Sequence, residues 1–204
     1  MKPARISGTE NYAEEAPQLL KRYESISFAD AHAPILQLIP PVPCRTLDIG
    51  AGTGRDAAGL VALGHSVLAV EPTEELRRGA MLLHPSSMIE WLDDSLPNLA
   101  AVRARKEEFD LVMLTAVWMH LDEARRRLAL PNVSELVRNG GTVIMSLRHG
   151  PIPPGRRTFE VSAEETIALA QRSSLFCRLN REAESSLRQP GVSWTRLVLQ
   201  KDTD

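Results

Sequence analysis

The feature that most constrains this chain is a run of three glycines that follows a short apolar stretch. Gly50, Gly52 and Gly54 stand at every second position, directly after residues 46–49 and directly before a helical pattern. Glycine lets the backbone turn sharply and approach a ligand closely because it has no Cβ. The free N–H groups at the start of the next helix then point at whatever lies above the strand. The run therefore predicts a strand, a glycine turn and a helix around a ligand site.

Strand and helix patterns alternate along most of the chain. Strand patterns lie at 46–49, 66–70, 88–91, 109–115 and 142–147, and helical patterns lie at 55–63, 74–83, 123–138 and 162–171. Two further strands, at 175–179 and 193–200, follow one another without a helix between them. The alternation predicts a parallel sheet with helices on both faces, and the last two strands predict an antiparallel pair at one edge. The fold class is therefore α/β and doubly wound.

Prolines and glycines set the expected limits of several elements. Residues 10–39 are helical in pattern, and Pro17 and Pro34 predict that they form two or three pieces. Pro131 predicts a kink or break in the helix at 123–138. Asn139–Gly141 predicts a turn into the fifth strand.

The composition is that of an ordinary globular chain, and 204 residues are enough for one domain. A net charge of −2 weakens a nucleic-acid-binding interpretation, although Arg125–Arg127 form a local basic run. The sequence contains neither an apolar run of roughly 20 residues nor the apolar core of a secretory signal, so we expect no membrane span and a cytoplasmic location. Cys44 and Cys177 lie far apart, which predicts free thiols and no metal site.

The glycine run lacks the parts that normally hold a pyrophosphate. A dinucleotide site needs the spacing G-x-G-x-x-G, and Arg55 stands where the third glycine belongs. A phosphate-binding P-loop needs a Gly-Lys-Ser/Thr sequence, which does not follow here. The run therefore favours a nucleoside ligand without phosphate and disfavours a nicotinamide-dependent reductase.

Several motifs, taken in order, resemble one enzyme family. The segment Asp48-Ile-Gly-Ala-Gly-Thr-Gly54 resembles the first motif of the class I S-adenosylmethionine-dependent methyltransferases. Glu71 at the end of the second strand, the Phe109-Asp-Leu-Val112 entry to the fourth strand and Asn139-Gly-Gly-Thr142 are similar to later family motifs, the last with Asn in place of Pro. The resemblance covers about residues 40–200. It implies a Rossmann-like sheet, the cofactor S-adenosyl-L-methionine and the product S-adenosyl-L-homocysteine.

The resemblance also implies roles for the first two strands. Asp48 is expected to accept hydrogen bonds near the ammonium group of the cofactor, and Glu71 is expected to accept both ribose hydroxyls. The backbone of the glycine turn is expected to contact the methionine end and the ribose. Arg55 is also a candidate for cofactor contact. The alternative is that Arg55 and Asp56 form only an ion pair at the start of a helix. The turn residues in the set are Gly50, Ala51, Gly52 and Gly54.

The loop after the third strand resembles the family's acidic adenine loop. Asp93 is the first choice for the carboxylate that meets the adenine amino group and Asp94 is the second, and one of the two is expected to cap the following turn. Leu92 and Pro72 are expected either to pack on the adenine faces or to pack into the core.

The end of the fourth strand is where the family places the transfer site. Thr115 and Ala116 are expected beside the cofactor. Trp118 offers a flat face to an acceptor, with core packing as the alternative. His120 is a candidate general base, with a purely structural hydrogen bond as the alternative. His149 at the end of the fifth strand is a second candidate base.

Three further segments are candidates for ligand contacts. In the family, a segment such as 1–43 folds over the active site, and 44–204 then form the Rossmann-like domain. Tyr23 is a candidate for the methionine carboxylate, and Tyr12 and Arg148 are candidates for the acceptor. The alternative for both tyrosines is a helix packed by its apolar stripe. Arg156 and Arg157 suit a carboxylate or phosphate on a substrate, or are simply solvated.

These observations favour N- or O-methylation of a small molecule by a monomer or homodimer. A nucleic-acid base is disfavoured, because no Asn-Pro-Pro-aromatic motif follows the fourth strand and neither cysteine lies at a strand end. The alternatives that remain open are an RNA or protein methyltransferase and a non-catalytic protein that binds adenosylmethionine.

Overall fold

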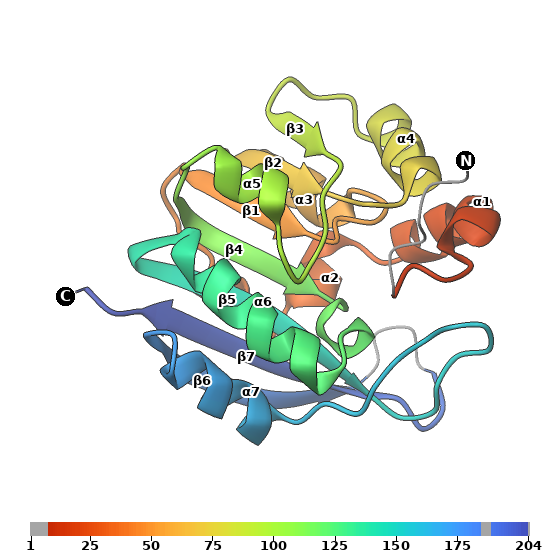
Figure 1. The fold of residues 1–204 in the computed structure, drawn as a ribbon. Helices are drawn as coiled ribbons and strands as arrows, with labels where there is room; N and C mark the ends of the chain where they lie inside the picture. Colours follow the sequence, from red (N-terminus) through yellow and green to blue (C-terminus); the bar gives the residue numbers. More distant parts are fainter. Residues whose placement is uncertain (1–7, 185–188, 204) are drawn as a thin grey trace.

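The computed structural model describes residues 8–184 and 189–203, and within them the chain forms one seven-stranded sheet (Figure 1). The strand order is β3-β2-β1-β4-β5-β7-β6. The strands are β1 (Arg45–Ile49), β2 (Ser66–Val70), β3 (Ile89–Leu92), β4 (Phe109–Thr115), β5 (Val137–His149), β6 (Leu175–Glu184) and β7 (Ser193–Lys201). All neighbours are parallel except β5–β7 and β6–β7. The predicted doubly wound α/β fold with an antiparallel edge pair is confirmed.

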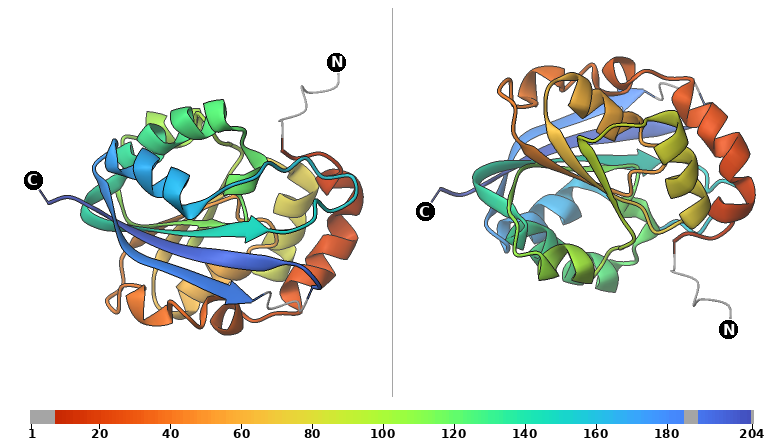
Figure 2. Two further views of the ribbon diagram at one scale, coloured as in Figure 1. Left: turned by 90° about the horizontal axis from the view of Figure 1, so that it is seen from below. Right: turned by 90° about the horizontal axis from the view of Figure 1, so that it is seen from above.

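Helices cover both faces of this sheet, as Figure 2 shows from two sides. One face carries α2 (Phe28–His32), the short 3-10 helix η1 (Leu36–Leu38) and α3 (Arg55–Ala62), and the other carries α5 (Ala100–Ala104), α6 (Glu123–Glu135) and α7 (Ala163–Gln171). Successive strand residues point to opposite faces, so Leu47 and Ile49 pack toward α5–α7 while Asp48 points toward α3. Each face therefore has its own apolar core, and Asp48 is an acid on the face that α2 and α3 cover.

Two helices lie at the carboxyl ends of the parallel strands rather than over a face. In Figure 1 α1 (Tyr12–Glu24) lies beside α4 (Glu74–Leu83) at that end of the sheet. They pack together through Ala16, Leu19 and Leu76, which are buried. The first helix of the N-terminal segment, α1, is thereby held beside the strand ends, whereas α2 and η1 lie over one face of the sheet. Among the described residues, no helix has the length and apolarity that crossing a membrane requires.

The predicted division of residues 10–39 into two or three pieces is confirmed, since they form α1, α2 and η1. The chain does not break at Pro17 or Pro131, however, because Pro17 lies inside α1 and Pro131 lies inside α6. Both prolines are exposed. The carbonyl four residues earlier loses its helical partner but can bond to water on that side. The N-terminal segment is broken elsewhere, at Ser25–Ser27 and just before Pro34.

The predicted turn at Asn139–Gly141 is also wrong, because these residues lie within β5. Between the pairs Phe109–Val137 and Leu111–Thr142, β5 advances by five positions while β4 advances by two. Gly140, with φ of +75°, absorbs this irregularity. The preceding helix consequently ends at Glu135 and does not reach residue 138.

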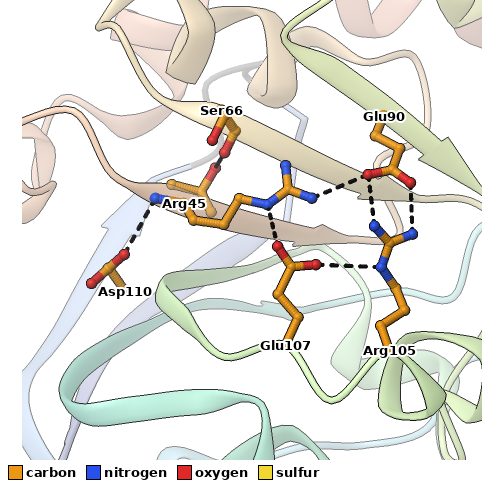
Figure 3. A network of polar contacts seen from close by, with 7 residues as sticks. Arg45, Ser66, Glu90, Arg105, Glu107 and Asp110 are labelled. Carbon is orange, nitrogen blue, oxygen red and sulfur yellow. Dashed lines mark hydrogen bonds and ion pairs between the residues drawn. The ribbon is translucent and has the colours of Figure 1, made fainter.

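An ion-pair network joins the strands at the opposite edge of the sheet from the glycine turn (Figure 3). Arg45 Nε lies 2.6 Å from Glu107, and its Nη2 lies 3.2 Å from Glu90. Arg105 joins the same two acids, at 2.6 Å from Glu90 and 3.3 Å from Glu107. The network ties β1 and β3 to the segment before β4, at a distance from the ligand-facing ends of the strands.

Candidate functional site

A cavity of about 240 Å³ opens at the carboxyl ends of the parallel strands. The glycine turn forms one wall, and the ends of β2, β4 and β5 form the floor. Residues of the N-terminal segment, including Tyr12 and Tyr23, form the opposite wall. The topology of the sheet brings these parts together, since the ends of all parallel strands meet at one edge.

The glycine turn is built so that no side chain separates its backbone from the cavity. The N–H groups of Gly50 and Ala51 both donate to the Val70 carbonyl, at 2.8 and 2.9 Å, which fixes the turn on β2. Gly50 has φ of +72°, and a Cβ there would lie 2.5 Å from Val117 Cγ2. Position 50 therefore accepts only glycine without local rearrangement.

Glu71 is buried at the end of β2 and holds the turn from the side. Its Oε2 accepts from the Gly52 N–H at 2.9 Å and its Oε1 accepts from the Thr73 N–H at 2.8 Å. Burial raises the pKa of the Glu71 carboxyl above its ordinary value. A carboxylate oxygen can accept two hydrogen bonds, so each oxygen retains capacity for a hydroxyl of a ligand.

Asp48 lines the same cavity and is 1% exposed. Its Oδ2 is buried and has no hydrogen-bond partner among the described residues. Burial, reinforced by the neighbouring Asp56 carboxylate, raises the pKa of Asp48 well above its ordinary value. A buried oxygen without a partner is costly, and a cationic donor in the cavity would remove that cost.

Asp56, in contrast, is a fully partnered acid. Its Oδ2 lies 2.8 Å from His32 Nε2, and its Oδ1 accepts from Arg55 Nε at 2.8 Å. Although burial alone would raise it, the pKa of Asp56 is held far below its usual range by His32 and Arg55. Both Arg55 and Asp56 line the cavity, and Asp56 also ties α2 to the start of α3.

The structure reverses the predicted order of the two acids after β3. Asp94 lines the cavity, and its Oδ2 accepts from the Ala101 and Val102 N–H groups at 2.8 and 2.9 Å. The side chain of Asp93 is 62% exposed and pairs with Arg77 at 3.1 Å. The predicted first choice, Asp93, therefore lies outside the cavity lining, and the helix-capping carboxylate is the one inside it.

The two apolar candidates near this loop, Pro72 and Leu92, lie in different surroundings. Pro72 lines the cavity, whereas Leu92 packs against the core on the α5–α7 side. For Leu92 the structure thus supports the alternative of core packing.

The segment after β4 divides between the cavity and the core. Thr115 and Ala116 line the cavity, and the Ala116 N–H donates to Ser146 Oγ at 2.8 Å. Trp118 is fully buried in the core on the α5–α7 side and is not part of the cavity wall among the described residues. The predicted acceptor face at Trp118 is corrected to core packing, because the backbone turns at Ala116, whose φ is +60°.

His120 makes one hydrogen bond through each of its ring nitrogens. Its Nδ1 lies 3.0 Å from the Arg157 carbonyl oxygen, which can only accept, so Nδ1 carries the proton. Its Nε2 lies 3.1 Å from the Tyr12 hydroxyl and is the unprotonated nitrogen of the neutral ring. Burial lowers the pKa of His120, and burial raises the pKa of Tyr12. Both residues line the cavity.

His149, the predicted second base, and its neighbour Arg148 both make hydrogen bonds within the protein. His149 Nε2 lies 2.8 Å from Thr195 Oγ1, and Arg148 Nη1 donates to the Pro151 carbonyl at 2.8 Å. Neither is part of the cavity wall that the described residues form. Strand alternation explains His149, because it falls on the face of β5 opposite to Ser146. The prediction for His149 is corrected accordingly. Arg148 falls on the same face of β5 as Ser146 and lies near Tyr12 and Tyr23, so its contact with an acceptor stays a prediction.

The loop at 150–159 is fastened to α1 and not to a ligand. Arg156 pairs with Glu15 at 2.7 Å, and its guanidinium lies 4.1 Å from the centre of the Tyr12 ring. The Asn11 side chain donates to the Gly155 carbonyl at 2.9 Å. In both views of Figure 2 this loop lies beside α1. Arg156 thus holds the wall that carries Tyr12.

The sequence did not reveal three cavity residues on β5 and β7, namely Ser146, Trp194 and Arg196. Arg196 is only 6% exposed. A signal was available, since Arg196 interrupts the apolar run of β7 and a charge inside a buried strand is unusual.

Comparison with known proteins finds one family that is similar to part of the chain. The family described as "Methyltransferase domain" matches residues 47–145, which span the glycine turn, Glu71 and the end of β4. Just under half of the chain is therefore similar to a methyltransferase domain.

Sequence relatives agree over part of their length. An uncharacterized methyltransferase of Mycobacterium tuberculosis is 33% identical over 111 residues, which cover 51% of this chain and 40% of the relative. Human glycine N-methyltransferase is 29% identical over 159 residues, covering 64% of this chain and 52% of that protein. This chain thus spans about half or less of the length of the curated relatives that it matches.

A solved structure agrees over nearly the whole chain. The Burkholderia thailandensis 1,6-didemethyltoxoflavin-N1-methyltransferase, with 1,6-didemethyltoxoflavin and S-adenosylhomocysteine bound, superposes with a TM-score of 0.70 at 17% identity. The match covers 99% of this chain and 93% of the other, and it shows a shared fold.

The residues of the cavity fit S-adenosylmethionine, the cofactor that the sequence resemblance implies. The unpartnered Asp48 Oδ2 suits the ammonium group of the cofactor, and Glu71 has acceptor capacity for a ribose diol. The glycine turn leaves its backbone open to the methionine end. The described residues contain no group of three His, Cys, Asp or Glu side chains that could hold a metal ion.

Proposed function

We propose that this chain transfers a methyl group from S-adenosylmethionine to a nitrogen or oxygen atom of a small molecule. The observation that carries the proposal is the cavity itself. Its wall joins Asp48 and Glu71, which suit the cofactor, to the His120 and Tyr12 pair, which suits an acceptor. One cavity therefore contains residues for both reactants.

The N-terminal segment supports a small acceptor. We propose that the described part of residues 1–43 covers the active site, since Gly8, Thr9, Tyr12 and Tyr23 line the cavity. The loop at 150–159 closes the same side through Arg156 and Asn11. A covered cavity suits a reaction that depends on positioning and on exclusion of water. Tyr23 is the residue of this wall that we propose for the methionine carboxylate.

In this proposal the cofactor supplies a methyl group that its sulfonium already activates. The protein positions the acceptor and, for a hydroxyl nucleophile, removes one proton. His120 is neutral with Nε2 unprotonated, so an acceptor hydroxyl that takes the place of the Tyr12 hydroxyl can pass its proton to Nε2. Tyr12 keeps that nitrogen occupied and oriented in the absence of an acceptor.

The alternative of an RNA or protein methyltransferase is less well supported. The basic run Arg125–Arg127 is paired internally, since Arg126 is buried against Glu165 at 2.9 Å and Arg127 pairs with Glu123. These side chains thus have acidic partners already, and a phosphate chain would have to displace them. The names of the two characterised relatives, a glycine and a toxoflavin-precursor methyltransferase, also concern small molecules.

The experiment incubates the purified chain with a metabolite extract and methyl-labelled S-adenosylmethionine, followed by mass spectrometry of the small-molecule fraction. We expect label in one or a few small products. Label found only in RNA or protein would show that the acceptor is a macromolecule and not a small molecule. Tight binding of S-adenosylhomocysteine without any transfer, in extracts of several sources, would support the non-catalytic alternative.

A further inference from the structure

A buried guanidinium lies on the acceptor side of the cavity. Arg196 sits on β7 opposite Ser146 on β5, and Ser146 in turn sits beside Thr115 on β4. Register partners share one face of a sheet, so these three side chains form a row. All three line the cavity. The row runs away from β1 and β2, which carry Asp48 and Glu71.

Arg196 has few partners for a buried cation. Its Nη2 donates to the Ala31 carbonyl at 2.9 Å, and its Nε is buried without a partner among the described residues. No carboxylate in the described ranges lies within 4 Å of it, whereas the nearby Arg55 has Asp56 at 2.7 Å. Burial lowers the pKa of Arg196, which expresses the cost of holding this charge away from water.

We propose that Arg196 binds a carboxylate group of the methyl acceptor. This inference rests on the proposed function and specifies that the acceptor is a carboxylic acid. A guanidinium matches a carboxylate with two parallel hydrogen bonds, and the unpartnered Nε supplies a donor for one of them.

Two neighbours refine the class. The Asp56 carboxylate acts on Arg196 from nearby, so a singly charged carboxylate balances the site better than a doubly charged phosphate. Trp194 also lines the cavity, and its ring centre lies 5.6 Å from the Arg196 guanidinium. A flat wall beside a carboxylate anchor suits an acceptor with a planar apolar body.

Position across the sheet separates this group from the cofactor's own carboxylate. Neighbouring strands lie about 4.8 Å apart, so β7 is about 14 Å across the sheet from β1. Asp48 and the glycine turn lie at β1. We place the methionine end at β1 and β4. The Arg196 side chain extends from β7 toward Asp56 and Arg55, so the titrations described below decide which carboxylate it binds.

The test uses the chain saturated with S-adenosylhomocysteine and follows its thermal unfolding with benzoate, acetate, benzamide or inorganic phosphate added. Wild type, R196Q, R196K and a control, R181Q, are compared. Arg181 is the exposed register partner of Arg196 on β6, so R181Q removes the same charge outside the cavity.

We expect benzoate to stabilise wild type and R181Q more than acetate does, and benzamide to have no effect. R196Q should weaken benzoate binding by about tenfold or more, because a charge-assisted pair is lost. R196K, which keeps the charge but loses the planar fork, should bind with intermediate affinity. Equal stabilisation of all four proteins by benzoate, or none in wild type, would overturn the proposal. Stronger stabilisation by phosphate than by benzoate would also contradict it.

A second measurement distinguishes the source of the carboxylate. Isothermal titration should give the same affinity for S-adenosylhomocysteine in R196Q and wild type. If R196Q loses that affinity but keeps its affinity for 5′-methylthioadenosine, which lacks the amino acid, Arg196 holds the cofactor and the proposal fails. If wild type binds S-adenosylhomocysteine and transfers methyl groups while no carboxylate acts through Arg196, only this inference fails and the proposed function stands.

Discussion

The two halves of the cavity are specified in different ways. The half at β1 and β2 is local, because the glycine turn and Glu71 lie within 22 residues of one another and bond directly to each other. The half at β4, β5 and β7 is assembled from Tyr12, His120, Ser146 and Arg196, which are far apart in sequence. Local geometry fits a cofactor that a whole family shares. The half that is assembled from distant segments can change without disturbing the turn, and we propose that it binds the acceptor.

The largest expected effect is on the local half. G50A places a Cβ 2.5 Å from Val117 Cγ2 on a backbone with φ of +72°. We expect the affinity for S-adenosylhomocysteine to fall by 100-fold or more, since the turn must move by more than the ligand tolerates. The matched control is G140A, which has φ of +75° but a Cβ in ordinary contact, at 3.4 Å from Thr203. Calorimetric titration of both variants would refute the account if G50A bound as tightly as G140A.

The next largest effect is expected on the methylation rate, from the half of the cavity that distant segments form. H120A should lower the methylation rate by about 100-fold for a hydroxyl acceptor, in line with the usual contribution of a general base. The affinity for S-adenosylhomocysteine should stay unchanged. H149A is the control, because His149 bonds to Thr195 outside the cavity lining. Steady-state rates with a fixed acceptor decide between them, and an equal loss in both variants would assign His120 a structural role.

A somewhat smaller effect is expected at Glu71. In E71Q one accepting oxygen becomes a donor that faces the Gly52 or Thr73 N–H group. Loss of one charge-assisted bond costs about 1.5–3 kcal/mol, so the affinity for S-adenosylhomocysteine should fall about tenfold to 100-fold. E75Q, at an exposed position of α4, should bind like wild type. Unchanged binding in E71Q would remove Glu71 from the cofactor site.

The smallest effect is on the pH dependence of the rate. Burial lowers the pKa of His120 below 6.5, so the ring protonates, and stops serving as a base, only at a pH below 6.5. The rate should therefore be flat between pH 7 and 8 and fall on the acid side. Circular dichroism at each pH confirms that the protein stays folded. A rate that falls above pH 7, with the protein folded, would contradict this assignment.

The same division explains what the sequence could predict. The glycine turn, Asp48 and Glu71 were predictable because one strand and one turn determine them. Asp93 and Asp94 differ only in which carboxylate reaches the N–H groups at the start of α5, and spacing does not settle that. His149 was misassigned because the predicted strand ended at residue 147, whereas β5 continues to His149 and alternation puts its side chain on the face opposite to Ser146.

Arg196 and the Tyr12–His120 pair depend on contacts between distant segments. Tyr12 reaches His120 only because α1 packs on α4 and Arg156 fastens the 150–159 loop. Arg196 faces the cavity only because β7 enters the sheet beside β5. These are properties of the tertiary arrangement, which no local motif encodes.

The central claim is that the local half of the cavity holds the cofactor. The most direct measurement is calorimetric titration of the wild-type chain with S-adenosylhomocysteine and, separately, with a nicotinamide dinucleotide. The account predicts one site with micromolar affinity for S-adenosylhomocysteine and no binding of the dinucleotide. Binding of the dinucleotide, or no binding of S-adenosylhomocysteine to the folded chain, would contradict it.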